Sequence, residues 1–520
     1  MKRYSKIRNM LRSATEPKQQ KQKEPIITLS SDLEDNEEML KKHLGTSEDL
    51  VYRHFTISFE DGNTLPALLV LVDGLSDQDA ARNNIIKPLN TYTLKRRKNH
   101  HTFTSIKHQI SVFQPVIVES DIKKAVVQIL KGSAFLIIDG IKQGMLMDIG
   151  GYELRALEEP QTERTVRGAR EGFIESVNTN MNLIRRRIPH PSLKFDSVSI
   201  GKYSQKKVVI AYMDEIADTK LINRVKKRLQ QIKSDSVDSS GFVEQVIEDH
   251  PHSMFPTIGN TERPDLAASL IVEGRIVILV DEDPFSLYVP YFFLESIKNI
   301  EDYSSRPYFT TLVRFIRLLS FFAAILFPAF YIAVLNFHKV MIPSDMVVPF
   351  IQARETVPFP LTMEILLVIF MFEIVREAGV RLPEQVGSAL SIVGALIFGQ
   401  VAVAAGIVGA PTAIVVSISY IASYVNNPVS DAISLLRIGL FIAASLFGAY
   451  GIIMPLLALL THMVSLTSIG IPYMAPLAPF HLQDLKDALL RFPYRFLKKR
   501  PESIPSKKKK QIESLPELED

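Results

Sequence analysis

The chain has 520 residues, with 60 Lys and Arg against 56 Asp and Glu, so its net charge is +4, and it contains no Cys. This length suits two to four domains. The lack of Cys excludes a disulfide framework, Cys-ligated zinc, iron–sulfur clusters and thiol catalysis. A charge this close to balance is not that of a nucleic-acid binder, so we expect no nucleic-acid partner.

Residues 1–48 run from a basic segment into an acidic one and contain few large apolar side chains. No apolar stretch precedes a small-residue cleavage site, so the segment is not a secretory signal peptide. Its apolar surface is too small to offset the entropy lost on ordering. We therefore predict a disordered leader over 1–48 and a cytoplasmic location for the region that follows it.

Between residues 49 and 305, short apolar runs alternate with Gly, Pro and charged turns, which is typical of a soluble α/β region. We expect two subdomains, at 49–155 and 156–305. Apolar runs of this kind predict buried strands, and apolar spacings of three and four residues predict helices. The expected strands are 65–75, 133–141, 208–213 and 274–284, and the expected helices include 171–188 and 221–232.

The membrane-like sequence follows Leu312. Leu318–Phe337 contains no Asp, Glu, Lys or Arg over 20 residues, which is enough helix to cross a hydrocarbon core of about 30 Å. Two later stretches, Gln385–Ser430 and Ile438–Gln483, lack these residues over 46 positions each. We predict an all-α polytopic membrane domain over 306–483, surrounded by membrane lipid. A basic cytoplasmic tail is expected over 484–520.

Two arguments give different numbers of membrane crossings. Basic residues before the first span, after the second and in the tail place both ends inside, which requires four or six crossings. Hydropathy instead predicts five helices, and either 411–425 is re-entrant or the Pro-rich run 463–480 returns across the membrane. The five helices are 318–337, 360–378, 386–409, 411–425 and 437–461.

Charged side chains within these apolar stretches each cost about 2.5–3.5 kcal/mol at a helix centre. Glu373, Arg376 and Glu377 share one helix face, and Glu377 precedes Arg381 by four residues. These charges can pair along the helix near the cytoplasmic boundary, while Glu364 faces the opposite side from Glu373. Structural pairing and the lining of an ion path or gate both stay open.

Small residues recur every three or four positions in the expected helix 386–409, and such a stripe allows helices to approach closely. Packing within one bundle and packing against copies of the chain around a pore both stay open. In the second interpretation Gln400, Val401 and Ala404 are candidates for the lumen. The stripe consists of Ser388, Ser391, Ala395, Gly399, Ala402, Gly406 and Gly409.

Enzyme motifs are missing from the sequence, including those for phosphate loops, dinucleotides, serine hydrolases and zinc proteases. We therefore expect no enzyme and no cofactor. The run Glu248–His252 has metal-ligand residue types at a spacing that is common by chance, so a surface turn is favoured over a metal site. A second set of charged residues predicts either salt bridges within the chain or contacts between copies: Glu163, Arg167, Arg170, Glu175 and Arg186.

Five blocks carry a resemblance that covers residues from about 50 to about 495. They are EEPQTERTVRGAREGFIESVNTNMNLIRRRI (158–188), IGKYSQKKVVIAYMDEIA (200–217), IEDHPHSMFPTIGNTERPD (247–265), EGRIVILVDEDPF (273–285) and VPFPLTMEILLVIFMFEIVREAGVRLPEQVG (357–387). The chain resembles the A subunit of spore germinant receptors, the GerA (GerABKA) family. It departs from the family at Asp281–Pro284, where Asp-Gly-Ser-Pro is common.

The resemblance implies a multi-pass protein of the spore inner membrane with its N-terminal region in the cytoplasm. It also implies a homo-oligomer that works with a polytopic B subunit, which binds the nutrient, and with a lipoprotein C subunit. Such A subunits are thought to form a nutrient-gated ion conduit. Two other functions stay open: a secondary transporter, suggested by possible helix breaks at Gly409–Pro411 and Met454–Pro455, and a non-conducting scaffold for other germination proteins.

Overall fold

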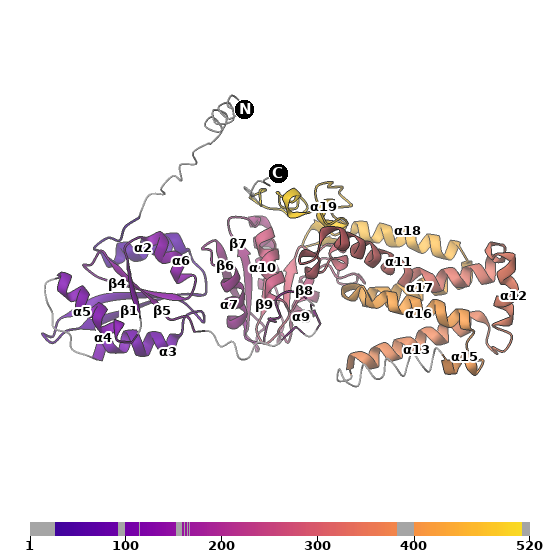
Figure 1. Cartoon of the computed structure of the whole chain (residues 1–520), viewed down its shortest axis with the longest axis horizontal. Coiled ribbons are helices and arrows are strands. Elements are labelled where there is room, and N and C mark those ends of the chain that lie inside the picture. Colours follow the sequence, from indigo (N-terminus) through magenta and orange to yellow (C-terminus); the bar gives the residue numbers. More distant parts are fainter. Residues whose placement is uncertain are drawn as a thin grey trace, which may run out of the picture. The chain divides into compact units, whose positions relative to one another are not determined.

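The computed structural model describes residues 27–91, 99–113, 115–151, 159–160, 162–163, 165, 167–381 and 400–511 (Figure 1). The chain divides into two compact units, Met1–Glu153 with Pro189–Pro191, and Leu154–Ile188 with Ser192–Asp520. A five-stranded antiparallel sheet lies in each unit. The second unit also contains the helical bundle. The division of this unit into domains at 156–305 and 306–483 stays a prediction.

The first unit is a sheet of order β1-β2-β4-β5-β3 with helices on both faces (Figure 1). Successive residues of β2 point to opposite faces: Leu69 and Leu71 pack with α4 and α5, whereas Leu68 and Val70 pack with α2 and α6. The elements are α2 (Leu33–Leu44), β1 (Leu50–Ser58), β2 (Thr64–Val72), α3 (Gln78–Ala80), the π-helical η1 (Ala81–Ile86), α4 (Lys87–Thr91), α5 (Asn99–Ser111), β3 (Val116–Glu119), α6 (Ile122–Ile129), β4 (Ser133–Ile138) and β5 (Gly144–Asp148).

Helix α2 corrects the prediction of a disordered leader over 1–48. Asp32 caps its first turn by accepting a hydrogen bond from the backbone N–H of Glu34 (2.8 Å). Leu33, Leu40 and Leu44 are buried and belong to the core on one face of the sheet. Their spacing of seven and four residues places them on one helix face, and the low average hydrophobicity of the segment hides this pattern. Residues 1–26 lie outside the described residues.

The second unit repeats this sandwich in a sheet of order β6-β7-β9-β10-β8. Val209 and Leu279 face α7 and α10, whereas Val208 and Ile278 face α8 and α9. The four expected strands are confirmed, two in each unit, and so are the two expected helices, which both lie in this unit. The helix expected at 171–188 begins at Val177. The elements are α7 (Val177–Arg187), β6 (Leu193–Ile200), β7 (Lys206–Met213), α8 (Thr219–Gln230), α9 (Ser240–Ile247), β8 (Gly259–Thr261), α10 (Pro264–Glu273), β9 (Ile276–Val280), β10 (Ser286–Val289), η3 (Phe293–Ile297) and η4 (Ile300–Tyr303).

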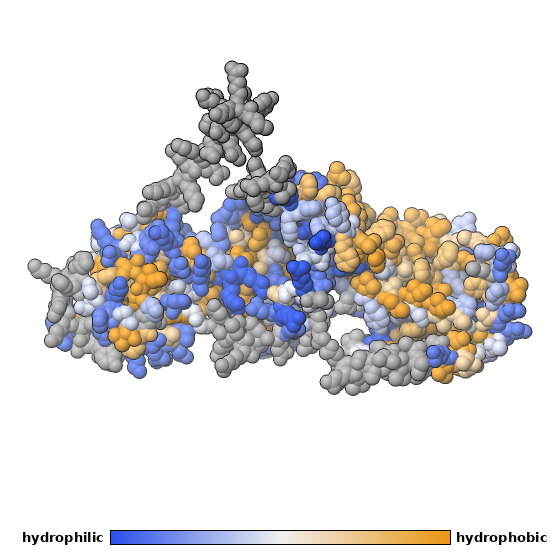
Figure 2. All heavy atoms as spheres, viewed as in Figure 1, coloured by the Kyte–Doolittle hydropathy of each residue, from blue (hydrophilic) through white to orange (hydrophobic). Residues whose placement is uncertain are grey.

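A helical bundle follows the second sheet in the same unit, and Figure 2 shows hydrophobic side chains gathered over it. Among the described residues, α11 and α17 are long and apolar enough to cross a membrane. The fold class, an α/β region followed by an all-α helical part, is confirmed. The elements are α11 (Pro307–Phe337), η5 (Lys339–Met341), α12 (Ser344–Gln352), α13 (Leu361–Arg381), α15 (Ala402–Ala404), α16 (Ala410–Tyr424), η7 (Asn427–Val429), α17 (Ser430–Phe447) and α18 (Tyr450–Ser465).

Helix α16 runs antiparallel to α11 over its whole length. Three hydrogen bonds join α11 to α16 or to a residue just after α16. From one bond to the next, the position moves seven residues back along α11 and seven residues forward along α16. The pairs are Tyr331 and Thr412 (3.3 Å), Ser419 to the Ala324 carbonyl (2.6 Å), and Asn426 to the Arg317 carbonyl (3.0 Å). The two outer pairs are therefore about 21 Å apart along the axis.

Two predicted helices have other bounds in the structure. The helix expected at 437–461 is two helices, because Gly448 takes a left-handed φ of 59° between α17 and α18. A Cβ at Gly448 would lie 2.9 Å from the Phe337 ring, so glycine is required at this reversal. Pro455 lies inside α18 and does not break it. Of the helix expected at 386–409, residues 386–399 lie outside the described residues. The described part contains the short helix α15, which ends at Ala404, before the expected end at 409.

The Pro-rich run 463–480 does not return across the bundle, which corrects one of the two alternatives for the crossings. It forms a hairpin of β11 (Thr467–Ser468) and β12 (Ile471–Pro472). The hairpin region bonds to the second sheet domain: Tyr291 N–H donates to the Ser468 hydroxyl (2.9 Å) and Phe293 N–H to the Tyr473 carbonyl (3.1 Å).

The expected basic tail is also partly folded. It contains α19 (Leu485–Ala488) and η8 (Tyr494–Phe496), and Ser506 forms a β-bridge with Ala217 of the second sheet domain. Buried Arg500 donates to the Val272 carbonyl at 3.1 Å. The segment to Gln511 is thus part of the second unit.

Candidate functional site

Two arginines among the described residues of the helical bundle are fully buried: Arg314 near the start of α11 and Arg437 of α17. Arg437 lies near the middle of its helix. Its guanidinium donates to Glu373 Oε1 of α13 at 2.8 Å and to the Ser434 hydroxyl at 3.2 Å. The guanidinium carbon also lies 3.6 Å from the centre of the Tyr420 ring of α16, which is a cation–π contact. Three helices therefore meet around one buried positive charge.

Glu373 connects this buried charge to the surface of the bundle. Its Oε1 also accepts from the Tyr420 hydroxyl at 3.0 Å, while its Oε2 accepts from Arg376 at 2.8 Å. Arg376 reaches Asp431, whose side chain is 91% exposed, at 3.3 Å. The carboxylate of Glu373 is thus shared by two arginines, one inside the bundle and one near its surface.

The predicted pairing along α13 is confirmed for both pairs. Arg376 pairs with Glu373, and Arg381 pairs with Glu377 at 2.6 Å on an exposed face. Sequence reasoning missed Arg437. The available signal was simple, because Asp431 and Arg437 are the only residues among Asp, Glu, Lys and Arg between Gln385 and Gln483.

Glu364 forms a second buried centre at the other end of α13. Its Oε1 accepts from the backbone N–H of Gly409 at 2.9 Å, and its Oε2 accepts from Arg354 at 3.2 Å. Gly409 precedes α16, so the carboxylate lies at the positive end of that helix dipole. Glu364 and Glu373 are nine residues apart, about 13 Å along the helix axis. The two carboxylates therefore belong to separate charge centres.

The small-residue stripe lies mostly outside the described residues, which exclude Ser388, Ser391, Ala395 and Gly399. Of its described members, Ala402 is half-buried, and Gly406 and Gly409 are buried against the loop around Arg354 and Thr356 of the same chain. The side chains of Gln400, Val401 and Ala404 are exposed, that of Val401 by 56%. A role of these three in a lumen stays a prediction.

The charged residues proposed for contacts between copies have partners within the chain. The Glu163 carboxylate accepts from the Thr261 hydroxyl and from the Glu262 N–H (3.0 Å). Burial raises the pKa of Glu163, and these two hydrogen bonds act against that rise. The other contacts are Arg170 with Glu159 (3.4 Å), Arg186 with Glu171 (3.7 Å), Arg167 N–H with Glu301 (3.3 Å), and the Glu175 carbonyl with Glu282 N–H (2.8 Å).

Comparison with known proteins decides the family. A profile described as Bacillus/Clostridium GerA spore germination protein matches residues 38–503. The chain belongs to this family. The resemblance stated from its sequence blocks is therefore confirmed, including the assignment to spore germination proteins.

Relatives of this GerA-family chain match along most of their length. Spore germination protein KA of Bacillus subtilis (strain 168) is 39% identical over 487 residues, covering 93% of this chain and 89% of that protein. An uncharacterized membrane protein of the same organism, YfkQ, is 37% identical over 475 residues and covers 91% of each. A solved structure, the N-terminal domain of the A subunit of the Bacillus megaterium spore germinant receptor GerK3, is 30% identical, covers 52% of this chain and 99% of that chain, and has a TM-score of 0.38.

In this GerA-family chain, Asp249 joins the sheet domain to the hairpin that follows α18. Its Oδ2 accepts from the Gly470 N–H (2.6 Å) and the Thr467 hydroxyl (2.5 Å), and it also pairs with Arg228. Burial by itself would raise the pKa of Asp249, but the bonds from Thr467 and Gly470 and the charge of Arg228 outweigh it and lower the pKa. The run Glu248–His252 is therefore a bridge to the hairpin, where the sequence favoured a surface turn.

Glu244 of α9, close to this bridge, makes stability depend on pH. Burial and, secondarily, the negative charge of Glu248 raise its pKa to about 7. Because the pKa is raised in the folded state, Glu244 makes a stabilising contribution to the free energy of unfolding that is fully present below the unfolded pKa of 4.5. This contribution is lost as pH rises through the folded pKa of about 7. In Glu244→Gln the side chain does not titrate, so its contribution to the free energy of unfolding does not change with pH. The melting temperature of the variant minus that of the wild type should therefore be larger at pH 8 than at pH 5. The increase should be about 2–4 °C for each kcal/mol of stability that the wild type loses between these two pH values.

The control for this prediction is Glu60→Gln, an exposed carboxyl in the first unit. In thermal unfolding of the full chain, the melting temperature of this control should change between pH 5 and pH 8 by the same amount as that of the wild type. A Glu244→Gln curve that also runs parallel to the wild type would contradict the assignment.

Proposed function

We propose that this chain is the A subunit of a nutrient-germinant receptor in the spore inner membrane. It works there with a polytopic B subunit and a lipoprotein C subunit. Copies of the chain assemble into an oligomer that forms or gates an ion-conducting path, with the sheet domains in the cytoplasm. Support comes from membership of a spore germination family, from the two apolar helices of membrane-spanning length, and from a related membrane protein of similar length.

Six membrane crossings are part of this proposal. At one end of the bundle, Arg376 of α13 pairs with Asp431 at the start of α17. At the other end, Gly409 before α16 bonds to Glu364 near the start of α13. The chain thus leaves α13 at one end and enters α16 at the opposite end. The helix predicted from the sequence at 386–409 is therefore kept as a crossing in this proposal, although its residues 386–399 lie outside the described residues. Together with α11, α13, α16, α17 and α18 this makes six, an even number that keeps both ends inside.

The observation that carries the proposed conduction is the pair of Arg437 and Glu373. Charges inside membrane bundles are costly, are usually paired, and often mark ion paths. Because Glu373 is shared by Arg376 and Arg437, a displacement of α17 relative to α13 changes the charge that is exposed inside the bundle. We therefore assign this centre, together with Glu364, to the gate. Gln400, Val401 and Ala404 are assigned to the path, and Glu377 and Arg381 to its cytoplasmic boundary.

Single cysteines test the path in this chain, which has no Cys of its own. Proteoliposomes would contain the full chain with the B and C subunits of its host, and ion release would be triggered by a panel of nutrients. Treatment of Val401→Cys with a water-soluble thiol reagent should reduce ion release by about tenfold if the adduct fills a narrow path, a barrier increase of about 1.4 kcal/mol.

The matched control is Leu446→Cys, whose position in α17 is 63% exposed and is expected to face lipid. Its ion release should not change on treatment. Val401→Cys that is labelled without loss of ion release would remove Val401 from the path. If the wild-type assembly releases no ion with any nutrient, the conducting function fails.

A further inference from the structure

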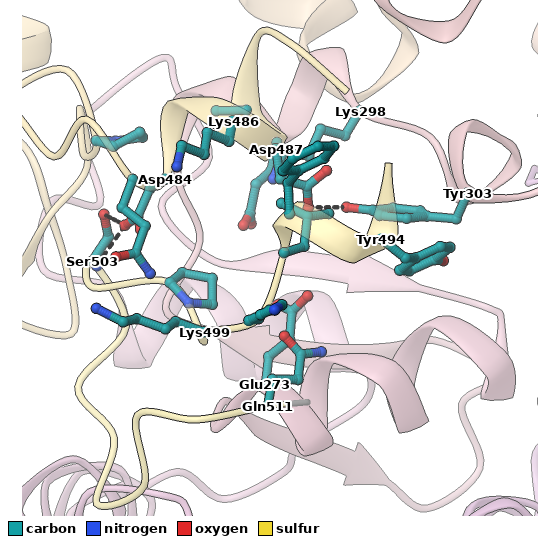
Figure 3. Close-up of a pocket in the computed structure, with 18 of the residues that line it drawn as sticks. Glu273, Lys298, Tyr303, Asp484, Lys486, Asp487, Tyr494, Lys499, Ser503 and Gln511 are labelled. Carbon is teal, nitrogen blue, oxygen red and sulfur yellow. Dashed lines mark hydrogen bonds between the residues drawn. The ribbon is translucent and has the colours of Figure 1, made fainter. Parts of the chain in front are cut away.

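A cavity of about 490 Å³ lies in the second unit, where the C-terminal segment covers the end of the second sheet domain (Figure 3). Its wall combines residues from Glu273 to Tyr303 with residues from Pro476 to Gln511. Six cationic side chains line it. One of them, Arg275, forms a buried salt bridge with Glu295. The other five are Lys298, Lys486, Arg495, Lys498 and Lys499. Four acidic side chains also line it: Glu273, Glu295, Asp484 and Asp487.

The acidic groups of the wall are already occupied. Asp484 accepts from the N–H groups of Glu502 (2.9 Å) and Ser503 (2.8 Å) and from the Ser503 hydroxyl (2.6 Å). This set of bonds closes the chain from Asp484 to Ser503 into a loop. Asp487 accepts from the Tyr303 hydroxyl at 2.7 Å, as Figure 3 shows.

The remaining two carboxylates serve Arg275. Glu295 accepts from its guanidinium at 2.7 Å, and Glu273 lies 3.4 Å from its Nε. Burial raises the pKa of Glu273, while the positive charges of Arg275 and Lys298 act against that rise.

Three lysines of the wall keep an uncompensated charge. Lys486, Lys498 and Lys499 are exposed, and none of them forms an ion pair with a residue in the part of the chain that the structure describes. The loop closed by Asp484 brings Lys498 and Lys499 to the same cavity as Lys486. The cavity is therefore a cationic enclosure with an open side.

This enclosure lies at the start of the first long apolar helix. Tyr303 precedes α11 by four residues, and Arg314 of α11 donates to the Asp487 carbonyl at 2.6 Å. Tyr494 and Phe496 on the cavity wall are 54% and 63% exposed. Exposed aromatic rings beside lysines at the end of a membrane helix are typical of the lipid headgroup region.

We propose that this cavity binds a phosphate-bearing anion, the headgroup of an acidic phospholipid at the cytoplasmic membrane surface. The proposal rests on the proposed membrane placement. Lys486, Lys498 and Lys499 supply ammonium groups to the phosphate, and Tyr494 and Phe496 lie beside the upper acyl chains. A bound headgroup would hold the C-terminal segment against the sheet domain, next to the helix that enters the membrane.

The test uses the full chain purified in detergent and then placed in nanodiscs of phosphatidylcholine with phosphatidylglycerol. Lipid retained by the protein is measured by mass spectrometry in Lys486→Ala/Lys498→Ala/Lys499→Ala. Retained phosphatidylglycerol should fall by about tenfold, because three cations that attract the anionic headgroup are removed. The control removes three exposed lysines elsewhere on the second unit, Lys220, Lys227 and Lys233, and should retain the wild-type amount.

A charge-conserving variant with Arg at the three cavity positions should also retain phosphatidylglycerol, which separates lost binding from lost folding. Inorganic phosphate distinguishes the source of the anion: if millimolar phosphate raises the melting temperature of the wild type and not of the Ala variant while phosphatidylglycerol is not enriched, the site takes a soluble phosphate.

Equal phosphatidylglycerol retention and equal phosphate response in the Ala variant and the lysine control would overturn the cavity as an anion site. Loss in both would also overturn it, because the effect would then follow net charge. Lipid binding is measured separately from ion release, so the two proposals can fail independently. A chain that conducts ions without retaining phosphatidylglycerol would contradict the anion site alone. A chain that retains phosphatidylglycerol without conducting would contradict the proposed conduction alone.

Discussion

Glu373→Ala is expected to lower the free energy of unfolding by about 3–5 kcal/mol, the usual cost of leaving a buried charge without its partner. The charge that loses its partner is Arg437, whose side chain is fully buried. Its remaining contacts, the hydroxyls of Ser434 and Ser419 and the Tyr420 ring, carry no negative charge. The measurement is thermal and denaturant unfolding of the full chain in detergent micelles.

Glu377→Ala is the matched control, because it removes the same side chain one turn further along the same helix. Its pair with Arg381 is exposed, 60% and 77% for the two side chains. We expect a loss of at most about 1 kcal/mol there. A loss at Glu373 no larger than the loss at Glu377 would contradict the burial of the pair.

A double variant separates the missing charge from the missing contacts. In Glu373→Leu/Arg437→Leu both charges are replaced by apolar side chains, which is often neutral or stabilising for a buried pair. This variant should therefore be more stable than Glu373→Ala. It should nevertheless lose the gating of ion release that is proposed for this centre. The double variant would then be stable but not gated, which separates the effect on stability from the effect on function.

The local elements were predictable because each depends on neighbours in the sequence. Four of the ten strands in the two sheets, β2, β4, β7 and β9, follow from apolar runs that are largely buried, such as Ile276–Val280. The ion pairs of α13 follow from spacings of three and four residues. Helix α2 was missed because three leucines on one face are diluted by charged residues between them. Periodicity carried more information there than composition.

The contacts that organise the candidate site could not be read from spacing. Arg437 pairs with a residue 64 positions earlier, and Thr467 bonds to Asp249 across 218 positions. Such partners are set by how helices and domains pack, and a single sequence gives no measure of that packing. What the sequence does provide is the rarity of the charge, since an isolated arginine between two 46-residue uncharged stretches requires a partner.

Arg263→Ala is expected to cost about 3–5 kcal/mol of stability in the second unit, because Arg263 is 1% exposed and its removal leaves Asp265 and several acceptors without their donor. The guanidinium donates five hydrogen bonds. Two go to Asp265 (3.1 and 2.8 Å), and one each to the Glu163 carbonyl (3.0 Å), the Thr165 hydroxyl (3.0 Å) and the Ala169 carbonyl (2.9 Å). It therefore fixes the segment that leads into α7.

Thermal unfolding and limited trypsin digestion of the full chain would measure this effect. Trypsin should cleave at Arg167 and Arg170 much faster in the Ala variant, since the segment loses its attachment. Arg263→Lys should recover little, because an ammonium group cannot reproduce the planar fork of five donors.

The control is Arg170→Ala, whose side chain is 67% exposed and pairs with Glu159 at 3.4 Å; a change of at most about 1 kcal/mol is expected there. Cleavage in this variant is compared at Arg167. If Arg263→Ala behaves like Arg170→Ala, the segment is held by other contacts. If it unfolds as expected, the block Thr261–Asp265 is a clamp within the chain, and contacts between copies must then use other charges, such as those of Arg167 and Arg186.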